Sequence, residues 1–405
     1  MIPYGKQHIT KEDIKAVIKV LQSEYLTGGP AVTKFEDLVK NFIGVKHAIA
    51  LSNATSGLHV ACLALGLGKG DVGVTAPVTF LASANCIAYC GARPDFVDVD
   101  EKTLCLSPAK LEEYIIKNGA PKIVIPVDFA GIPADLPKIW KLSKKYNFKI
   151  IEDASHSVGS KYTYRNKTYN CGACDHADLA VFSFHPVKTV TAGEGGMVLT
   201  NDDDLARKVR MFASHGMERE QKHFEQWNIN NSNGKLGLSN SKNQSKKIEK
   251  APWLYQQKLL GYNYRITDIQ SALGTSQFKR IKKTISKRKK IFNSYQKAFM
   301  NNKDIICPII PKNVEPASHL YVIRYAGNDR NWRLKTCLFL RENGVFSQVH
   351  YIPVHLQPWY QNNYKFDQEN YPISERFYDT CLSIPLFPDL TKVELKKIIN
   401  LINKI

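Results

Sequence analysis

The sequence predicts an α/β protein whose larger domain holds a mostly parallel sheet covered by helices. Short apolar runs alternate with helical stretches from about residue 30 to residue 215, and such alternation is typical of parallel sheets. Polar residues that can bind ligands or take part in catalysis follow several of these runs directly, as expected where parallel strands end. The chain has 405 residues and 43% hydrophobic content, which is enough for two domains. We therefore predict a large domain over residues 1–270 and a smaller α+β domain over residues 271–405.

Apolar segments bounded by turn-forming residues predict the strands. They lie near 47–51, 72–76, 94–98, 122–127, 149–153, 178–184 and 196–200. Helical stretches are expected between them, near 55–67, 79–90, 107–117 and 135–146, and a long amphipathic helix is expected from Thr267 onward. Residues 218–252 interrupt the pattern because they are rich in Asn, Ser and Lys. We expect a long mobile loop there.

Lys188 follows the apolar run that ends at Ser183 and precedes a glycine-rich turn. Burial disfavours the ammonium form, so a lysine drawn out of water can lose its proton. A neutral amine is needed for bond formation with a carbonyl compound such as pyridoxal phosphate (PLP). The alternative is a lysine that simply reaches solvent, which is the commoner fate of this residue type.

Asp153 ends another short apolar run, and His156 follows it in the next turn. PLP acts as an electron sink only while its pyridine nitrogen carries a proton, and a buried Asp paired with that nitrogen keeps the proton there. His156 is placed to stack near the ring or to bond its phenolic oxygen. The alternative for Asp153 is a cap of the following turn.

Thr55 and Ser56 begin a predicted helix directly after a strand, and N–H groups and hydroxyls at a helix N-terminus bind anions such as phosphate. A capped helix without a ligand is the common alternative. The Ser183 hydroxyl is placed to join the same phosphate. Phe80 offers a flat face to a pyridine ring, although ordinary core packing would also account for it.

Five ordered motifs carry a resemblance to a known family: 53–56, 77–80, 152–156, Ser183-Phe184-(x3)-Lys188 and 261–265. Together they resemble the DegT/DnrJ/EryC1 family of PLP-dependent nucleotide-sugar aminotransferases over nearly the whole chain. The resemblance implies the aspartate aminotransferase-like fold (fold type I). It also implies that Lys188 bonds the cofactor and moves protons, while Asp153 holds the pyridine nitrogen.

The same resemblance implies further ligands. Asn263 would contact the phosphate from the neighbouring subunit, so that a homodimer shares its active sites; a turn residue is the alternative reading of Asn263. The family's substrate contacts fall on Tyr4, Tyr25, Leu26, Thr27, His350, Tyr351, Ile352, Pro353 and His355.

Residues 214–217, 252–255 and 349–355 resemble one branch of this family. Enzymes of that branch aminate a UDP-4-keto-6-deoxy-N-acetylhexosamine in pseudaminic acid biosynthesis, with glutamate as the usual amino donor. Relatives that make 4-amino-arabinose, perosamine or viosamine share the core motifs and stay as alternatives. A sugar-sensing regulator of the same fold would be expected to lack Lys188 or Asp153, and both are present.

The formal net charge of +19 suggests nucleic acid as a partner. However, lysines are spread along the chain, and the dense run 280–290 is expected to be mostly a solvated helix face with Ile281, Ile285 and Phe292 turned inward. We expect no nucleic-acid partner and, in the absence of a long apolar segment, no membrane partner.

Cysteine usage points to a reducing compartment. The nine cysteines are scattered, odd in number and often inside apolar segments, which favours the cytoplasm over a disulfide framework. Cys171 and Cys174 have the spacing of a metal or redox pair, but a second pair of ligands is lacking. We predict a loop there and no metal.

Overall fold

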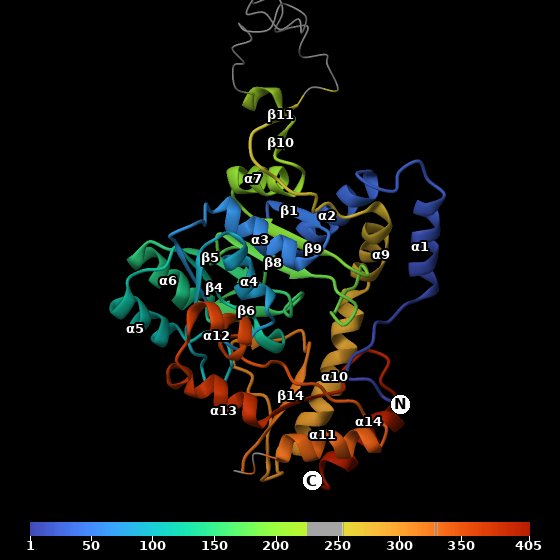
Figure 1. The fold of residues 1–405 in the computed structure, drawn as a ribbon. Helices are drawn as coiled ribbons and strands as arrows, with labels where there is room; N and C mark the ends of the chain where they lie inside the picture. The colour runs from blue at the N-terminus through green and yellow to red at the C-terminus, as the bar shows by residue number, and fades with distance from the viewer. Residues whose placement is uncertain (225–252, 254, 328, 330) are drawn as a thin grey trace, which may run out of the picture.

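A seven-stranded sheet forms the centre of the computed structural model, which describes residues 1–224, 253, 255–327, 329 and 331–405 (Figure 1). The strand order is β1 (His47–Leu51), β9 (Gly196–Thr200), β8 (Leu179–Ser183), β5 (Lys149–Asp153), β4 (Ile123–Ile125), β2 (Val72–Thr75) and β3 (Arg93–Phe96). The five strands from β8 to β3 are parallel, and β9 is antiparallel to both its neighbours. The predicted fold class is confirmed, and each of these strands begins and ends within two residues of its predicted range.

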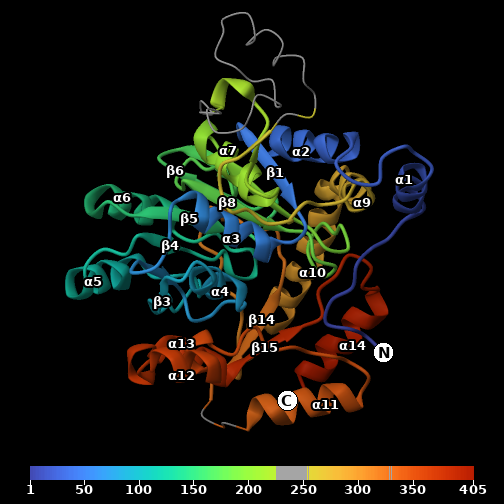
Figure 2. The same ribbon diagram turned by 45° about the horizontal axis from the view of Figure 1, so that its top comes forward.

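Helices cover both faces of the sheet (Figure 2). One face carries α3 (Ala54–Ala64), α4 (Ala82–Tyr89) and α7 (Asp203–Ala213). The other carries α2 (Pro30–Ile43), α5 (Pro108–Asn118), α6 (Leu136–Tyr146) and α9 (Asp268–Phe278). Side chains alternate between these layers, as in any strand: Leu51 of β1 joins the core beneath α3, while Ala50 joins the core beneath α2.

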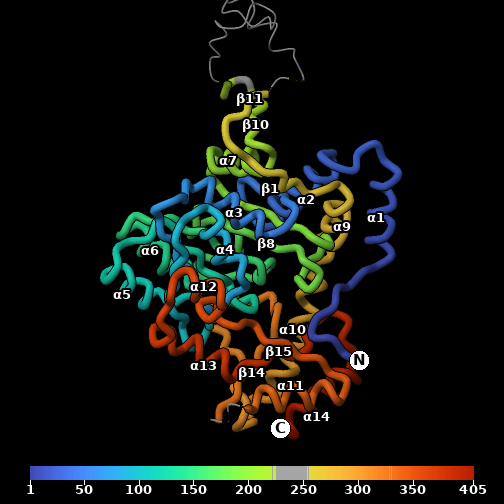
Figure 3. The backbone as a smooth tube through the Cα atoms, in the orientation of Figure 1, coloured from blue at the N-terminus to red at the C-terminus, as the bar shows by residue number. Residues whose placement is uncertain are grey.

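A second core packs around α10 (Ile281–Phe299) and includes Tyr295, Ile323 and Leu340. Its other elements are β12 (Ile305–Ile306), β14 (Tyr321–Tyr325), α11 (Trp332–Glu342), β15 (Cys381–Ile384) and α14 (Lys392–Ile402). Helices α12 (Pro358–Tyr364) and α13 (Pro372–Thr380) pack against residues of the central sheet, because Tyr360 shares a core with Phe96 and Phe377 shares one with Val124. Strands β12, β14 and β15 form an antiparallel sheet. Ile2 packs into this core, and both chain ends lie in this part of the molecule (Figure 3). The domain boundary near residue 270 stays a prediction.

The remaining elements are mostly short. A small sheet joins β13 (Val314–Glu315), β6 (Lys161–Tyr164) and β7 (Lys167–Asn170). Single turns of 3-10 helix occur at η1 (Phe129–Gly131), η2 (Gln221–His223), η3 (Val354–Leu356) and η4 (Gln368–Asn370). Helix α1 (Lys11–Leu21) lies apart from the sheet, against α9 (Figure 1). Across the described ranges, no helix is both long and apolar enough to cross a membrane.

The first residue of the loop predicted over 218–252, Glu218, lies in a strand. Strand β10 (Met217–Glu218) pairs with β11 (Gln256–Gln257), and this pair extends away from the body (Figure 3). Glu218 is buried and accepts a hydrogen bond from Arg207 at 3.3 Å. Residues 225–252, the greater part of the predicted loop, lie outside the described residues.

One prediction for the region after Thr267 was wrong in detail. The expected long helix is two helices, because the backbone at Arg280 leaves the helical region (φ −108°, ψ 14°) between α9 and α10. In the basic run, Ile281 and Phe292 are buried as predicted, and one cation is buried as well. Arg288 is only 2% exposed and donates hydrogen bonds to the backbone oxygens of His319 (3.1 Å) and Leu386 (3.0 Å).

Candidate active site

A cavity of about 1000 Å³ opens at the carboxyl ends of β5 and β8, where the sheet meets the C-terminal part. It brings together most of the residues predicted from the sequence. These are Tyr4, Thr55, Ser56, Phe80, Asp153, His156, Ser183, Lys188, His350, Tyr351 and Ile352. Segments separated by nearly 350 positions in the chain therefore share one cavity.

Lys188 stands in the loop between β8 and β9, and this loop is fixed by its own hydrogen bonds. The Lys188 N–H donates to the His185 backbone oxygen at 2.9 Å, and the Ala192 N–H donates to the Phe184 oxygen at 2.9 Å. Burial lowers the pKa of Lys188 to about 8, while the nearby Asp153 carboxylate acts in the opposite direction. A substantial fraction of this amine is therefore neutral near physiological pH.

Asp153 is the last residue of β5 and is 4% exposed. One carboxylate oxygen accepts a hydrogen bond from Ser83 Oγ at 2.6 Å, and the other accepts one from the Ser155 N–H at 3.1 Å. Ser83 Oγ in turn lies 2.8 Å from Thr79 Oγ1. These bonds fix the carboxylate in the cavity wall. A fixed, buried carboxylate suits the task of holding a positively charged ring nitrogen.

The hydrogen bonds of His156 indicate which of its nitrogens carries the proton. The Ala130 N–H donates to Nδ1 at 3.3 Å, so Nδ1 is an acceptor. Nε2 then carries the hydrogen and lies 3.1 Å from the Tyr351 hydroxyl. Burial lowers the pKa of His156 well below its usual range, and the charge of Lys188 adds to this effect. The ring is therefore a neutral, positioned hydrogen-bonding group.

The N-terminal turn of α3 forms another part of the wall. Asn53 caps this helix, because its side chain accepts from the Ser56 N–H at 2.8 Å. The first N–H groups of a helix have no partner within it, and Ala54 and Thr55 line the cavity. Gly196 lets this turn approach β9, since a Cβ there would lie 2.4 Å from the Asn53 backbone oxygen. The predicted anion site is thus open to the cavity.

Aromatic and histidine side chains form the opposite wall. Phe80 is 57% exposed inside the cavity, and its ring centroid lies 6.1 Å from that of Tyr351. The His350 ring lies 5.5 Å from Tyr4, and its Nδ1 is 2.8 Å from Ser383 Oγ. Burial lowers the pKa of His350 to about 4, and Lys188 contributes further. This wall is therefore uncharged, with aromatic faces and hydrogen-bonding groups.

The donor set of the cavity fits PLP. A partly neutral lysine, a fixed carboxylate, an open helix N-terminus and an aromatic face all line the same space. Each part matches one group of the cofactor: the carbonyl carbon, the ring nitrogen, the phosphate and the ring face. The residues that would hold it are Lys188, Asp153, Thr55, Ser56, Ser183, Phe80 and His156.

Several predicted residues do not line this cavity. Tyr25 and Leu26 are 51% and 48% exposed, and the backbone of Thr27 pairs with that of Thr267. Asn263 is exposed and pairs through its backbone with Ser214. Within one chain, these residues lie outside the site around Lys188.

The structure places His355 in a packed region and not in the cavity. Its side chain is fully buried, its Nε2 lies 3.1 Å from a Glu375 carboxylate oxygen, and its ring centroid is 4.4 Å from that of Tyr371. The neighbouring Pro353 is buried as well and is not among the residues lining the cavity. The structure therefore does not place His355 where it could touch a substrate in the cavity. Its ring is enclosed by neighbouring side chains and contributes to packing.

Sequence reasoning missed Ser83 and His319. Ser83 lies four residues after Thr79, within the helix predicted over 79–90, so this spacing was a usable signal for a polar pair, although α4 begins only at Ala82. His319 lines the cavity with its ring centroid 4.5 Å from that of His156, and its Nδ1 is buried without a partner among the described residues. No local pattern marks His319, because its importance comes from residues distant in the chain.

Cys171 lies behind the Asp153 strand together with two acids. Ligand atoms of Asp128, Glu152 and Cys171 all lie within 4.8 Å of one another, and all three residues are buried. Burial raises the pKa of Glu152 and of Asp128, and the Gly172 N–H donates to Glu152 at 3.0 Å. Two carboxylates buried this close together disfavour a second negative charge, so the raised pKa values favour a protonated Glu152.

Comparison with known proteins agrees with the cavity. A family model described as the DegT/DnrJ/EryC1/StrS aminotransferase family matches residues 7–403. The chain is 34% identical to the spore coat polysaccharide biosynthesis protein SpsC of Bacillus subtilis, covering 100% of this chain and 97% of that protein. It is also 34% identical to the UDP-4-amino-4,6-dideoxy-N-acetyl-beta-L-altrosamine transaminase of Campylobacter jejuni, with coverage of 98% and 95%.

Among solved structures, the chain resembles Helicobacter pylori PseC, an aminotransferase involved in the biosynthesis of pseudoaminic acid. The TM-score is 0.86 at 29% identity, covering 100% of this chain and 98% of that one.

Proposed function

The chain belongs to the DegT/DnrJ/EryC1/StrS aminotransferase family, and we propose that it moves the amino group of glutamate to C4 of a UDP-4-keto-6-deoxy-N-acetylhexosamine. It is a PLP-dependent sugar aminotransferase. The products of the proposed reaction are 2-oxoglutarate and a UDP-4-amino-4,6-dideoxy sugar. The observation that carries the proposal is the placement of Lys188 and Asp153 in one cavity.

When bound, PLP supplies an electron sink for the negative charge that develops at the carbon bearing the amino group. Lys188 would hold the cofactor and, once displaced by the amino donor, carry a proton between that carbon and the cofactor. Its pKa of about 8 suits both directions of transfer, because acid and base forms are both populated near neutral pH. Asp153 would hold the proton on the ring nitrogen throughout.

The other cavity residues would position the two substrates. The α3 N-terminus with Thr55, Ser56 and Ser183 would bind the cofactor phosphate. Tyr4, His350, Tyr351 and Ile352 form the wall opposite the sheet and would contact the sugar. His350 and His156 have lowered pKa values, so they would act as neutral hydrogen-bonding groups near the C4 oxygen.

A homodimer would complete the site. Asn263, Tyr25, Leu26 and Thr27 lie outside the Lys188 cavity of their own chain, which supports a role in the neighbouring subunit's site. Subunit mixing tests this proposal, because two inactive variants, Lys188→Ala and Asn263→Ala, complement each other only across an interface. About a quarter of the wild-type sites would be restored in a two-fold dimer. No restoration would place Asn263 outside the partner's site.

The pathway is proposed from the relatives. The altrosamine transaminase and the pseudoaminic acid enzyme support a role in pseudaminic acid biosynthesis. The spore coat relative has the same identity, 34%, and favours a second candidate: amination of another nucleotide sugar for a surface polysaccharide. All nine cysteines are free thiols, which supports the proposed cytoplasmic location.

The experiment offers PLP-loaded protein glutamate together with a panel of UDP-4-keto sugars. Formation of 2-oxoglutarate measures turnover, and NMR of the product assigns the sugar and the configuration at C4. We expect turnover with the N-acetylated 6-deoxy sugar. Turnover only with another sugar would select the second candidate, and turnover no higher than that of Lys188→Ala would contradict both.

A further inference from the structure

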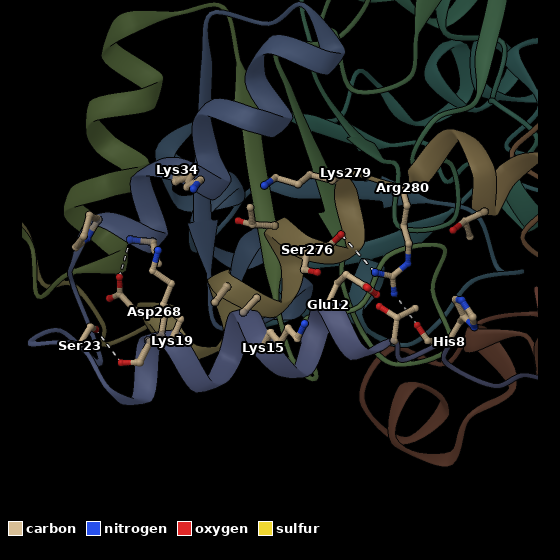
Figure 4. Close-up of a pocket in the computed structure, with 18 of the residues that line it drawn as sticks. His8, Glu12, Lys15, Lys19, Ser23, Lys34, Asp268, Ser276, Lys279 and Arg280 are labelled. Atoms are coloured by element: carbon tan, nitrogen blue, oxygen red, sulfur yellow. Dashed lines mark hydrogen bonds between the residues drawn. The ribbon is translucent and has the colours of Figure 1, made fainter.

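A second cavity, here named the α1 cavity, lies between α1, α2, α9 and the start of α10 (Figure 4). Its volume is about 990 Å³, close to that of the Lys188 cavity. Among the described residues, the two cavities share no lining residue. Apart from Tyr25, which is proposed above for the neighbouring subunit's site, the described residues of the α1 cavity have no role in the proposed aminotransferase reaction.

Six lysines from three helices and the α9–α10 junction line the α1 cavity: Lys15, Lys19, Lys34, Lys279, Lys283 and Lys287. Among the described residues, only Lys287 has a carboxylate within 4 Å, that of Asp389 at 3.6 Å. Figure 4 shows the Lys34 and Lys279 amines directed toward each other from opposite sides. Like charges repel when they face each other, so this arrangement favours an anion between them.

The acids of the cavity do not neutralise these lysines. The lining carboxylates are Glu12 and Asp268. Asp268 is buried and accepts hydrogen bonds from the N–H groups of Gly29 (2.7 Å) and Ala31 (2.8 Å). Its charge therefore fixes the start of α2. A strong positive excess remains, and a concave wall of one sign concentrates its field within the cavity.

One buried hydroxyl on the wall, that of Thr275, points to a ligand independently of the lysines. Thr275 is 7% exposed, and its Oγ1 has no hydrogen-bond partner among the described residues. Arg280 binds Asp13 and the His8 backbone oxygen through its terminal nitrogens, but its Nε is likewise without a partner. Buried polar groups in folded proteins are almost always hydrogen-bonded, so an acceptor is expected at this wall.

We propose that the α1 cavity binds a small polyanion with a di- or triphosphate chain, held by Lys34 and Lys279 and by the hydroxyl of Thr275. Lysine binds phosphate as a compact point charge. Six lysines match a chain of several phosphates better than a single carboxylate or monophosphate. Inorganic polyphosphate and the diphosphate of a nucleotide share this chemistry.

Isothermal titration of PLP-loaded protein with inorganic tripolyphosphate tests the proposal. Lys34→Ala/Lys279→Ala should weaken binding by about tenfold. The matched control is Lys289→Ala/Lys290→Ala, which removes two exposed lysines from the same basic surface outside the cavity. It should weaken binding less than about twofold, because screening limits distant charges. Equal losses in both variants, or no saturable binding by the wild type, would overturn the proposal.

Thr275→Val separates a ligand contact from a structural role. Removing an unpartnered buried hydroxyl should leave the melting temperature unchanged or raise it, while tripolyphosphate binding weakens. A lower melting temperature with unchanged binding would contradict the proposed contact. Titrations with pyrophosphate and UDP then distinguish the two sources of such a phosphate chain. Equal binding of both would show that the cavity recognises the phosphates alone. Tighter binding of UDP, weakened by Lys34→Ala/Lys279→Ala, would show that the cavity also recognises the nucleoside. Equally tight binding of citrate would overturn the phosphate assignment.

Discussion

The two cavities, of about 1000 and about 990 Å³, hold lysines in opposite environments. Lys188 is the one lysine among the described residues that line its cavity, where it lies with histidines, tyrosines and the fixed Asp153 carboxylate, and burial lowers its pKa to about 8. Lys34 and Lys279 are exposed at the α1 cavity among other cations. The comparison teaches that desolvation, and not the number of amines, turns a lysine into a nucleophile.

Of the substitutions that distinguish the two cavities, Lys188→Ala should have the largest effect on activity. Loss of the group that holds the cofactor and transfers the proton should lower kcat/KM by about 10⁴-fold or more. The melting temperature of the cofactor-free protein should not fall, because a desolvated amine is removed. Lys34→Ala/Lys279→Ala removes two lysines and should leave basal turnover unchanged. Comparable losses in both variants would break the comparison.

The pH dependence of PLP incorporation should show the lowered pKa of Lys188 directly. The neutral amine is the reactive form, so its fraction sets the rate. At pH 7 a pKa of about 8 gives roughly 300-fold more neutral amine than the usual 10.5 would give. Incorporation by cofactor-free protein, followed by visible absorbance, should rise with pH to a midpoint near 8. A midpoint near 10.5 would show that Lys188 is solvated like the lysines of the α1 cavity.

Asp153→Asn should lower kcat by about 100-fold, because a neutral amide cannot hold the ring-nitrogen proton. The amide has nearly the same shape and its oxygen can accept one of the two hydrogen bonds made by the carboxylate, so the variant should still fold and bind PLP, which its melting curve and visible absorbance would show. Ser83→Ala removes one hydrogen bond to the same carboxylate and serves as the comparison. It should cost much less activity, and a larger loss than that of Asp153→Asn would contradict the role assigned to Asp153.

Glu152 precedes Asp153 in β5 and its side chain points to the other face of the sheet. Glu152→Gln tests whether desolvation keeps this acid neutral. Burial raises the pKa of Glu152 in the folded state, so its contribution to stability is complete below the unfolded pKa and is lost as pH rises. Glutamine mimics the protonated form at every pH. The variant's unfolding free energy should therefore fall less than that of wild type between pH 5 and 9, by up to about 1.4 kcal/mol per pH unit. Identical pH profiles would contradict a protonated Glu152.

The central sheet could be predicted because its strands are short apolar runs that end on polar residues, as at Asp153 and Ser183. The β6–β7 hairpin was not predicted. Its turn residues Arg165 and Asn166 both have positive φ (50° and 63°), a geometry that Asn-Gly usually signals. Arginine at the first position hides that signal.

The candidate site likewise has a part that the sequence predicts and a part that it does not. Lys188, Asp153 and the start of α3 follow strands and could be read from local sequence. The wall of Tyr351, His350 and His319 depends on packing between the two parts of the molecule, which no local pattern encodes. Arg288 shows the converse, because a residue within a basic run is buried by backbone oxygens far away in the chain.

The most direct test of the central claim is the location of the cofactor after borohydride reduction of PLP-loaded protein. Reduction makes the bond between lysine and cofactor permanent, and mass spectrometry of the digested protein then identifies the modified peptide. The proposed site requires the cofactor mass on Lys188 alone, with its loss in Lys188→Ala and its retention in Lys34→Ala/Lys279→Ala. Modification at the α1-cavity lysines in place of Lys188, or none at Lys188, would contradict it.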